Sequence, residues 1–503
     1  MMIRSALIGS TAIAVLFSGV AAFADVTPED VWENWKAAAE QGGTGITAAS
    51  EERDGDTLVI TGISMASTAD PAVSTEGLIE EMRLKDLGEG TVEITMSDSY
   101  SLAVTTPAIE GIEPPVAQTV AISISAPGAV TIASGTPQAV AYDFDLPTVE
   151  ATMATNADGA DPFNFTLSAV NVSGSYLVEG TDLLTSTGDF AFESLSLAAK
   201  GKDVDAGQDV EMTAAIGDVA GSFDATLLDP AMMEDMAAAL EAGFSFAFDT
   251  SYGATSFTLN VVEAGSPTSI SGGLDGGSIN VAMDSEAFVY ETGSKGLNLT
   301  VSSADIPFPE VKLALAEGGF GLSMPTTPTE EPAEFSFLAK LVDLSISDEI
   351  WGMLDPGSVI PHDPATVIID SKGMVRLTSN LFAPDAMATA APPGELISFD
   401  LTQLLARIAG AELTGTGALT FDNTDLTTFS GVPAPTGKVD LQVKGANKLM
   451  DTLIAMGMMS EDDAMGARMM LSMFANPGAG ADEFTSVLEF KDKGFYANGQ
   501  RLQ

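Results

Sequence analysis

His362 is the first residue that could do chemistry, because it is the only histidine and the chain has no cysteine. A Ser-His-Asp arrangement would have to use it, and no G-x-S-x-G turn is present to supply a nucleophilic serine. A zinc site would lack its usual histidine and cysteine ligands. We interpret His362 as a polar residue of a proline-flanked loop, and we predict no catalytic residue, no metal ligand and no cofactor.

Carboxylates are the second group that could do chemistry, because they could bind calcium, which needs only oxygen ligands. Residues 156–161 and 203–209 place acids two or more apart beside glycine. Neither segment fits the twelve-residue EF-hand loop. Asp-Gly turns in a β protein produce the same pattern, so we predict turns at both places.

A methionine-rich segment over residues 447–475 is the most specific local feature. Its apolar residues recur at helical spacing in two runs, and Ser460 with the acids after it begins the second run, which predicts an αα-hairpin. Methionine fills cores and also lines adaptable binding surfaces, so both interpretations stay open. We expect the stripe to face a sheet and to be largely buried; if it lines an apolar groove instead, the candidates are Met450, Leu453, Met458, Met469, Met473 and Phe474.

The elements around these residues are mainly strands. Apolar residues alternate with Ser, Thr or acids at residues 58–60, 92–96, 120–124, 140–144, 163–167 and 188–192, which predicts an antiparallel meander. Helical spacing predicts short helices near residues 28–40, 230–243, 348–354 and 401–408. Strand-like segments at residues 484–490 and 494–497 predict a closing hairpin.

Two larger parts are expected on either side of a Pro/Thr/Glu-rich loop at residues 325–334. Residues 25–324 form a β-rich N-terminal part, and residues 335–503 form a C-terminal β part that contains the αα-hairpin. The predicted fold is mainly β: one or more elongated, curved antiparallel sheets with a few short helices.

The N-terminus predicts export. A basic start, an apolar run from Ala6 to Ala22 and the small-x-small box before Asp25 are typical of a signal peptide over residues 1–24, cleaved after Ala24. The formal charge of −51 argues against nucleic acid as a partner. No later apolar run is long enough for a transmembrane helix. We therefore expect a periplasmic protein.

Several motifs resemble one exported alphaproteobacterial family, the domain of unknown function 2125. The motifs are Val31-Trp32 with Trp35, Trp351 with Asp355-Pro356, residues 361–366, Gly445-Ala446-Asn447, residues 464–470, residues 473–475 and residues 497–502. The resemblance implies a periplasmic location and no established activity. More loosely, long amphipathic strands with Gly-x-Gly segments, as at residues 413–419, resemble AsmA-type envelope proteins, which implies curved sheets with an apolar groove.

The leading functional hypothesis is a non-enzymatic envelope protein, either a scaffold or a carrier with an apolar, lipid-like groove. One alternative is a periplasmic hydrolase, metal-assisted by acids and His362, and another is an adhesin or matrix protein. The groove hypothesis requires strands whose apolar face is not fully covered. The hydrolase hypothesis requires His362 and several acids to converge in one pocket.

Overall fold

The computed structural model describes residues 25–41, 44–67, 74–106, 118–155, 163–180, 183–203, 208–228, 230–263, 265–383 and 392–503. The predicted signal peptide and the acidic segment at 156–161 lie outside these residues, and the segment at 203–209 lies partly outside them. Within the described residues, all strands belong to one antiparallel sheet.

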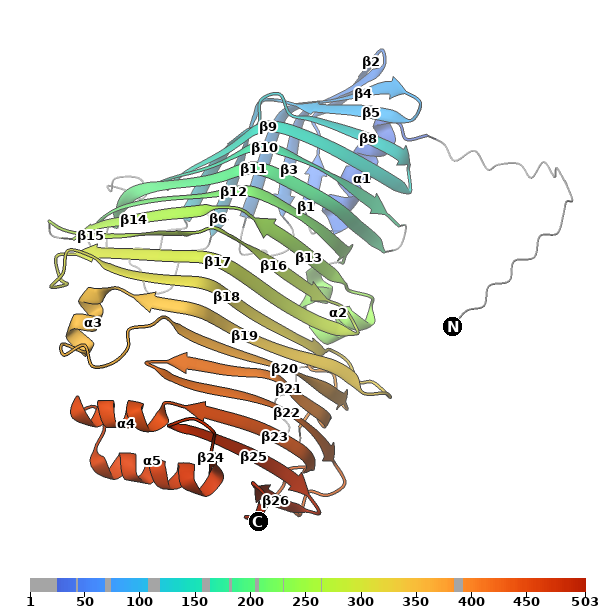
Figure 1. The fold of residues 1–503 in the computed structure, drawn as a ribbon. Helices are drawn as coiled ribbons and strands as arrows, with labels where there is room; N and C mark the ends of the chain where they lie inside the picture. Colours follow the sequence, from blue (N-terminus) through green and yellow to red (C-terminus); the bar gives the residue numbers. More distant parts are fainter. Residues whose placement is uncertain are drawn as a thin grey trace, which may run out of the picture.

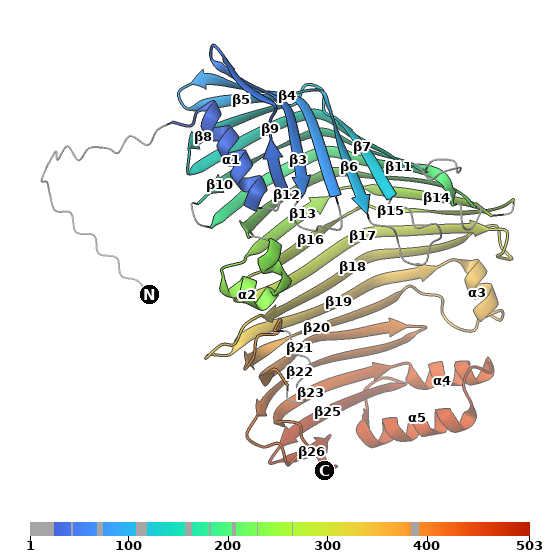
Figure 2. The same cartoon turned by 180° about the vertical axis from the view of Figure 1, so that it is seen from behind.

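The sheet is elongated and curved, with its strands stacked in a long array (Figures 1 and 2). Its N-terminal strands are β1 (Thr44–Thr47), β2 (Ser50–Asp54), β3 (Thr57–Ser67), β4 (Ser74–Gly88), β5 (Thr91–Met96), β6 (Ser99–Thr106), β7 (Gln118–Ser125), β8 (Val130–Thr136) and β9 (Ala139–Thr155). The central strands are β10 (Phe163–Glu179), β11 (Leu184–Asp203), β12 (Gln208–Leu227), β13 (Phe246–Tyr252), β14 (Thr255–Glu263), β15 (Ser266–Leu274), β16 (Gly276–Met283), β17 (Ala287–Ser303), β18 (Val311–Pro325) and β19 (Ala333–Ile346). The C-terminal strands are β20 (Ala365–Leu377), β21 (Gly394–Ile408), β22 (Ala411–Asp422), β23 (Ala434–Lys444), β24 (Asn476–Pro477), β25 (Glu483–Lys491), β26 (Gly494–Ala497) and β27 (Gln500–Arg501).

Each strand named in the sequence analysis lies inside one of these strands, so the period-two alternation identified them correctly. The closing hairpin is β25 with β26, whose residues pair from Leu488 with Ala497 to Lys491 with Gly494. The loop after Pro325 joins β18 to β19, and these two strands pair directly. The sheet is therefore continuous across the loop. The loop also contributes one core residue, because Thr326 is buried and donates its hydroxyl to the carbonyl of Asp284.

Five helices accompany the sheet in the described part of the chain: α1 (Pro28–Gln41), α2 (Met236–Glu241), α3 (Asp348–Leu354), α4 (Ala446–Ala455) and α5 (Glu461–Phe474). Helices α1 and α2 lie in front of the sheet in Figure 2, whereas α3, α4 and α5 lie at the ends of strands. The predicted helices at 28–40 and 348–354 and the predicted αα-hairpin are confirmed as α1, α3 and α4–α5. None of the helices in the described residues is long and apolar enough to span a bilayer.

Two helix predictions needed correction. Residues 401–408 are not helical but form the end of β21. Between residues 230 and 243 there is a 3₁₀ turn over Pro230–Glu234 followed by the short helix α2. Asp235 caps α2, because its side chain accepts from the backbone N–H of Ala238. The helix therefore begins six residues later than the Pro230 start predicts.

The hydrophobic core lies at the N-terminal end of the sheet. The fully buried Val31 and Trp32 of α1 pack in one cluster with Ile60, Leu84 and Tyr142 and with further apolar residues of β3–β5 and β8–β10. Reciprocal bonds between Thr27 and Asp30 start α1: Asp30 N–H donates to Thr27 Oγ1 at 3.2 Å, and Thr27 N–H donates to Asp30 Oδ2 at 3.0 Å. Trp32 and Trp35 therefore lie on the side of α1 that packs against the sheet.

A line of backbone irregularities crosses the middle of the sheet. Asn171 in β10, Asp218 in β12, Gly296 in β17 and Asp343 in β19 all have positive φ, between 50° and 64°. At Gly296 no other residue fits easily, because a Cβ there would meet the side chain of Asp275. The apolar alternation shifts phase by one residue along this line. An extra residue in each strand would otherwise move the apolar side chains to the opposite face. The phase shift therefore keeps the same face apolar on both sides of the line.

Candidate functional site

One row of directly paired residues crosses the sheet from β9 to β26, and nearly all of it is apolar. Directly paired residues in an antiparallel sheet point to the same face, so the row lies on one face. In order, it contains Tyr142, Tyr176, Gly188, Phe223, Phe248, Val281, Tyr290, Leu322, Phe337, Ser371, Leu401, Gly417, Val439, Leu488 and Ala497. At about 4.8 Å per strand, this apolar row spans roughly 65 Å.

The neighbouring row on the opposite face has a different composition. It is mostly polar, running through Asp143, Ser175, Asp189, Ser222, Asp249, Asn280, Glu291, Gly321, Leu338, Asp370 and Gln403. The sheet therefore has one polar face and one apolar face over most of its length. We call the latter the apolar face.

The apolar face is fully covered at its N-terminal end. Tyr142 is fully buried beneath α1, and its hydroxyl donates to Asn34 Oδ1 at 2.7 Å. From Phe223 to Leu488, the large apolar residues of the row are all partly exposed. Their neighbours on the same face are more exposed still: 36% for Phe246, 38% for Phe320 and 44% for Leu341. Helix α2 lies on the same side of the sheet as α1 (Figure 2) and buries its own Ala239 and Leu240, but it leaves the large apolar residues of the row in partial contact with solvent.

Ring contacts link the row from strand to strand. The rings of Tyr142 and Tyr176 stack with centroids 4.8 Å apart, and those of Phe190 and Phe248 stack at 5.8 Å. Further along, Phe320 meets Phe337 edge-on at 5.8 Å. Burial under the N-terminal core raises the pKa of Tyr176 to about 12, so its phenol is neutral at physiological pH. The face thus offers apolar contact without charge.

The methionine stripe on the αα-hairpin is mostly outside the core, contrary to expectation. Met450 alone of the candidates is buried, at 8% exposed, while Leu453 and Phe474 are half-buried. Met458, Met465, Met469, Met470 and Met473 are between 54% and 63% exposed. The predicted burial is therefore wrong for most of the stripe.

The reason is that α5 packs through a different set of side chains. Ala464 is fully buried, and one turn later Arg468 donates from Nε to Asn447 Oδ1 at 3.2 Å and from Nη2 to Asp451 on α4. This polar contact orients α5 on α4 and turns Met465 and Met469 outward. The cap at Ser460 is as predicted, with Asp463 N–H donating to Ser460 Oγ at 3.1 Å.

His362 holds a loop together. Its Nε2 lies 3.3 Å from Oδ2 of the buried Asp355, and its ring stacks on Trp351 with centroids 4.3 Å apart. The same Oδ2 accepts from Ile360 N–H at 2.7 Å. Pro361 of this loop lies against Gly410 in the β21–β22 turn. The described residues contain no group of three or more His, Asp or Glu placed to hold a metal ion.

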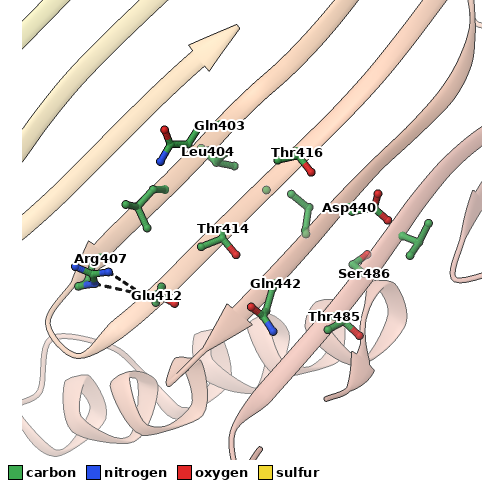
Figure 3. A pocket seen from close by; sticks show the side chains of 14 residues that line it. Gln403, Leu404, Arg407, Glu412, Thr414, Thr416, Asp440, Gln442, Thr485 and Ser486 are labelled. Carbon is green, nitrogen blue, oxygen red and sulfur yellow. Dashed lines mark hydrogen bonds and ion pairs between the residues drawn. The ribbon is translucent and has the colours of Figure 1, made fainter. Parts of the chain in front are cut away.

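A pocket of about 650 Å³ opens on the polar face of β21, β22, β23 and β25 (Figure 3). Gln403, Thr414, Thr416, Asp440 and Gln442 contribute much of its polar lining. At its rim Arg407 Nη2 donates to Glu412 Oε2 at 3.1 Å, and this bond, with Lys444 beyond it, holds the pKa of Glu412 below its usual range. The amide, hydroxyl and carboxylate groups of this lining offer hydrogen-bond donors and acceptors, and His362 is not among the lining residues.

The apolar row itself was not foreseen as a unit, although its members belong to strands predicted from alternation. Alternation gives the apolar side of each strand, but the register that aligns those sides depends on long-range pairing. The signal that could have found it is the recurrence of Phe-x-Phe, as at residues 190–192, 246–248 and 335–337, in strand after strand.

Comparison with known proteins gives one match. Residues 253–498, from just before β14 to just after β26, match a family described as an uncharacterized protein conserved in bacteria (DUF2125). No curated protein and no solved structure matches the chain. The similarity to AsmA-type proteins stays a prediction.

Proposed function

The chain belongs, through residues 253–498, to the bacterial family DUF2125, and on the geometry of its sheet we propose that it is a non-enzymatic carrier for a lipid-like ligand. The ligand's acyl chains would lie on the apolar face between Phe223 and Leu488. The single observation that carries the proposal is that the large apolar side chains of the row stay partly exposed from Phe223 to Leu488.

Size and charge favour a lipid as the occupant. Contiguous apolar patches on soluble monomers rarely exceed a few hundred Å², and larger ones mark interaction sites. At about 4.8 Å per strand, the part of the row from Phe223 to Leu488 spans roughly 48 Å, which is longer than a small-molecule pocket and suits one or more extended hydrocarbon chains. The row carries no charged side chain, so it matches the hydrocarbon part of a lipid and leaves a headgroup at the solvent.

We also propose that the protein works in the periplasm, after export and cleavage behind Ala24. Intact-mass measurement of the periplasmic form tests this, because a mass that retains residues 1–24 would contradict it. A periplasmic location would place the carrier between two membranes, where an apolar ligand needs a protein to cross water.

The direct test is to purify the mature protein from its own periplasm, extract it with organic solvent and identify bound lipids by mass spectrometry. We expect acyl lipids in molar proportion to protein. A protein that yields none, and that also fails to bind a fluorescent fatty acid in solution, would refute the proposal.

A pair of variants separates the face from the fold. Phe320→Asp places a carboxylate on the apolar face at a position that is already 38% exposed, so the sheet should survive while probe binding falls. Leu338→Asp is the matched control, because Leu338 pairs with Gly321 on the polar face of the adjoining strand. Equal loss of binding in both variants would show that the apolar face is not the binding surface.

A further inference from the structure

Four aromatic rings on the apolar face lie over glycines of the neighbouring strand. Phe144 pairs directly with Gly174, Phe190 with Gly221, Tyr252 with Gly277 and Phe335 with Gly373. In every pair a ring atom lies within 2.7 Å of the point where a Cβ of the glycine would stand. The pairs recur at intervals from β9 to β20.

Because of this geometry, each ring lies flat against the sheet and reaches over the neighbouring strand. A ring that stood perpendicular to its strand would keep its tip away from the neighbouring Cα. Only glycine leaves the space for such a ring, an arrangement in which the aromatic side chain shields the bare glycine backbone. The apolar layer is therefore about one ring thick, and it forms a continuous floor rather than a set of separate pockets.

The floor also curves, because the sheet that carries it bends along its length (Figures 1 and 2). A flexible hydrocarbon chain can bend to keep contact with such a floor. A rigid fused-ring lipid touches only two or three strands before it lifts away.

From these pairs we infer that the apolar face selects flexible, unbranched acyl chains over rigid fused-ring lipids, and that the glycine–aromatic pairs keep its floor continuous. This inference rests on the proposed carrier function and names its ligand class. Phe190, Tyr252 and Phe335 each cover a glycine in the uncovered part of the sheet, and Phe190 and Phe335 can be truncated without removing a hydroxyl group.

The test compares two fluorescent probes on the mature protein, dansyl-undecanoic acid as the chain and dehydroergosterol as the fused-ring lipid. We expect the chain to bind at least about tenfold more tightly than the sterol, a difference of about 1.4 kcal/mol. Equal affinity would overturn the selectivity and leave the carrier function standing. Failure to bind either probe would instead overturn the carrier function.

Variants test the role of the pairs. Truncating the rings is cleaner than replacing the glycines, because a backbone carbonyl oxygen also crowds the Cβ positions of Gly221 and Gly373. Phe190→Ala and Phe335→Ala should each weaken binding of the chain by about tenfold, since each leaves a gap over a bare glycine. Unchanged circular dichroism and thermal midpoint would verify that both variants remain folded.

Phe246→Ala is the matched control. Phe246 lies on the same face but pairs with Ala225, whose methyl group keeps the floor filled when the ring is removed. We expect a loss of less than about threefold for this variant. If Phe246→Ala weakens binding as much as Phe190→Ala and Phe335→Ala do, the pairing with glycine has no special role.

Discussion

Replacement of methionine by glutamine at two positions of the αα-hairpin tests how this hairpin is attached. Glutamine has nearly the length of methionine and a similar helix propensity, so the two substitutions differ mainly in burial. Met450 on α4 is 8% exposed, whereas Met469 on α5 is 62% exposed. The sequence alone treats the two residues alike, as members of one apolar stripe.

The expected magnitudes differ clearly. At Met450 the amide would enter a site with no evident partner, at a cost of about 1–3 kcal/mol, and most of the apolar burial of the side chain would be lost, about 1.5–3 kcal/mol more. At Met469 the side chain already meets water, and such surface changes stay within about 0.5 kcal/mol. Met450→Gln should therefore destabilise the hairpin by about 2.5–6 kcal/mol, while Met469→Gln should be nearly neutral.

Urea denaturation of the mature protein, followed by circular dichroism and by limited proteolysis within residues 446–474, measures both effects. Met450→Gln should make the hairpin sensitive to protease at a lower urea concentration than wild type. The reasoning fails if Met469→Gln destabilises the hairpin as much as Met450→Gln, because the outward face of α5 would then be part of the core.

Three further outcomes are expected. Trp32→Ala should lower stability by about 3–5 kcal/mol and release α1, because Trp32 is 2% exposed; an unchanged urea midpoint would contradict this. Hydrogen bonds from Lys493 and from neighbouring threonines hold the pKa of Asp425 well below its usual range, so the stability that Asp425 contributes is fully present above the unfolded pKa of about 4 and is lost as pH falls through the folded pKa. Asp425→Asn should therefore make the C-terminal hairpin less stable at pH 7. It should also reduce the further loss of stability between pH 7 and pH 3, as measured by proteolysis at both pH values. His362→Gln should leave fatty-acid binding unchanged and cost about 1 kcal/mol through loss of its hydrogen bond and of its stacking on Trp351, measured by urea denaturation; loss of binding in the folded variant would revive a catalytic or ligand role for His362.

Local patterns predicted the elements of this fold well. Alternation identified the strands, because the side-chain period of two is a property of the strand itself. Residues 401–408 show how that reasoning fails. Leu401, Leu404, Leu405 and Ile408 recur at i, i+3, i+4 and i+7, the spacing of a helix. In the structure a register shift between Leu401 and Leu404 gives β21 one extra residue relative to β22, which creates this spacing within the strand.

The candidate site was harder to predict, for two physical reasons. Register between strands decides whether apolar side chains join into one row, and register depends on contacts between residues far apart in the chain. Coverage decides whether that row is core or surface. The alternation of β10 and of β17 is similar, yet Val178 is 6% exposed beneath the N-terminal core, while Tyr290 is partly exposed. Nothing within either strand distinguishes the two situations.

The high negative charge of the chain opposes association of its copies through the apolar face. A long, uncovered apolar face would drive copies of the protein to associate, since association removes that face from water. The formal charge of −51 opposes this, because two copies that approach each other bring like charges together. Acids such as Asp189, Asp249 and Glu291 lie on the polar face, directly behind the apolar row, and leave the row itself free of charge. Repulsion at long range and apolar contact at short range thus disfavour a second copy of the chain while leaving the face open to an uncharged hydrocarbon chain.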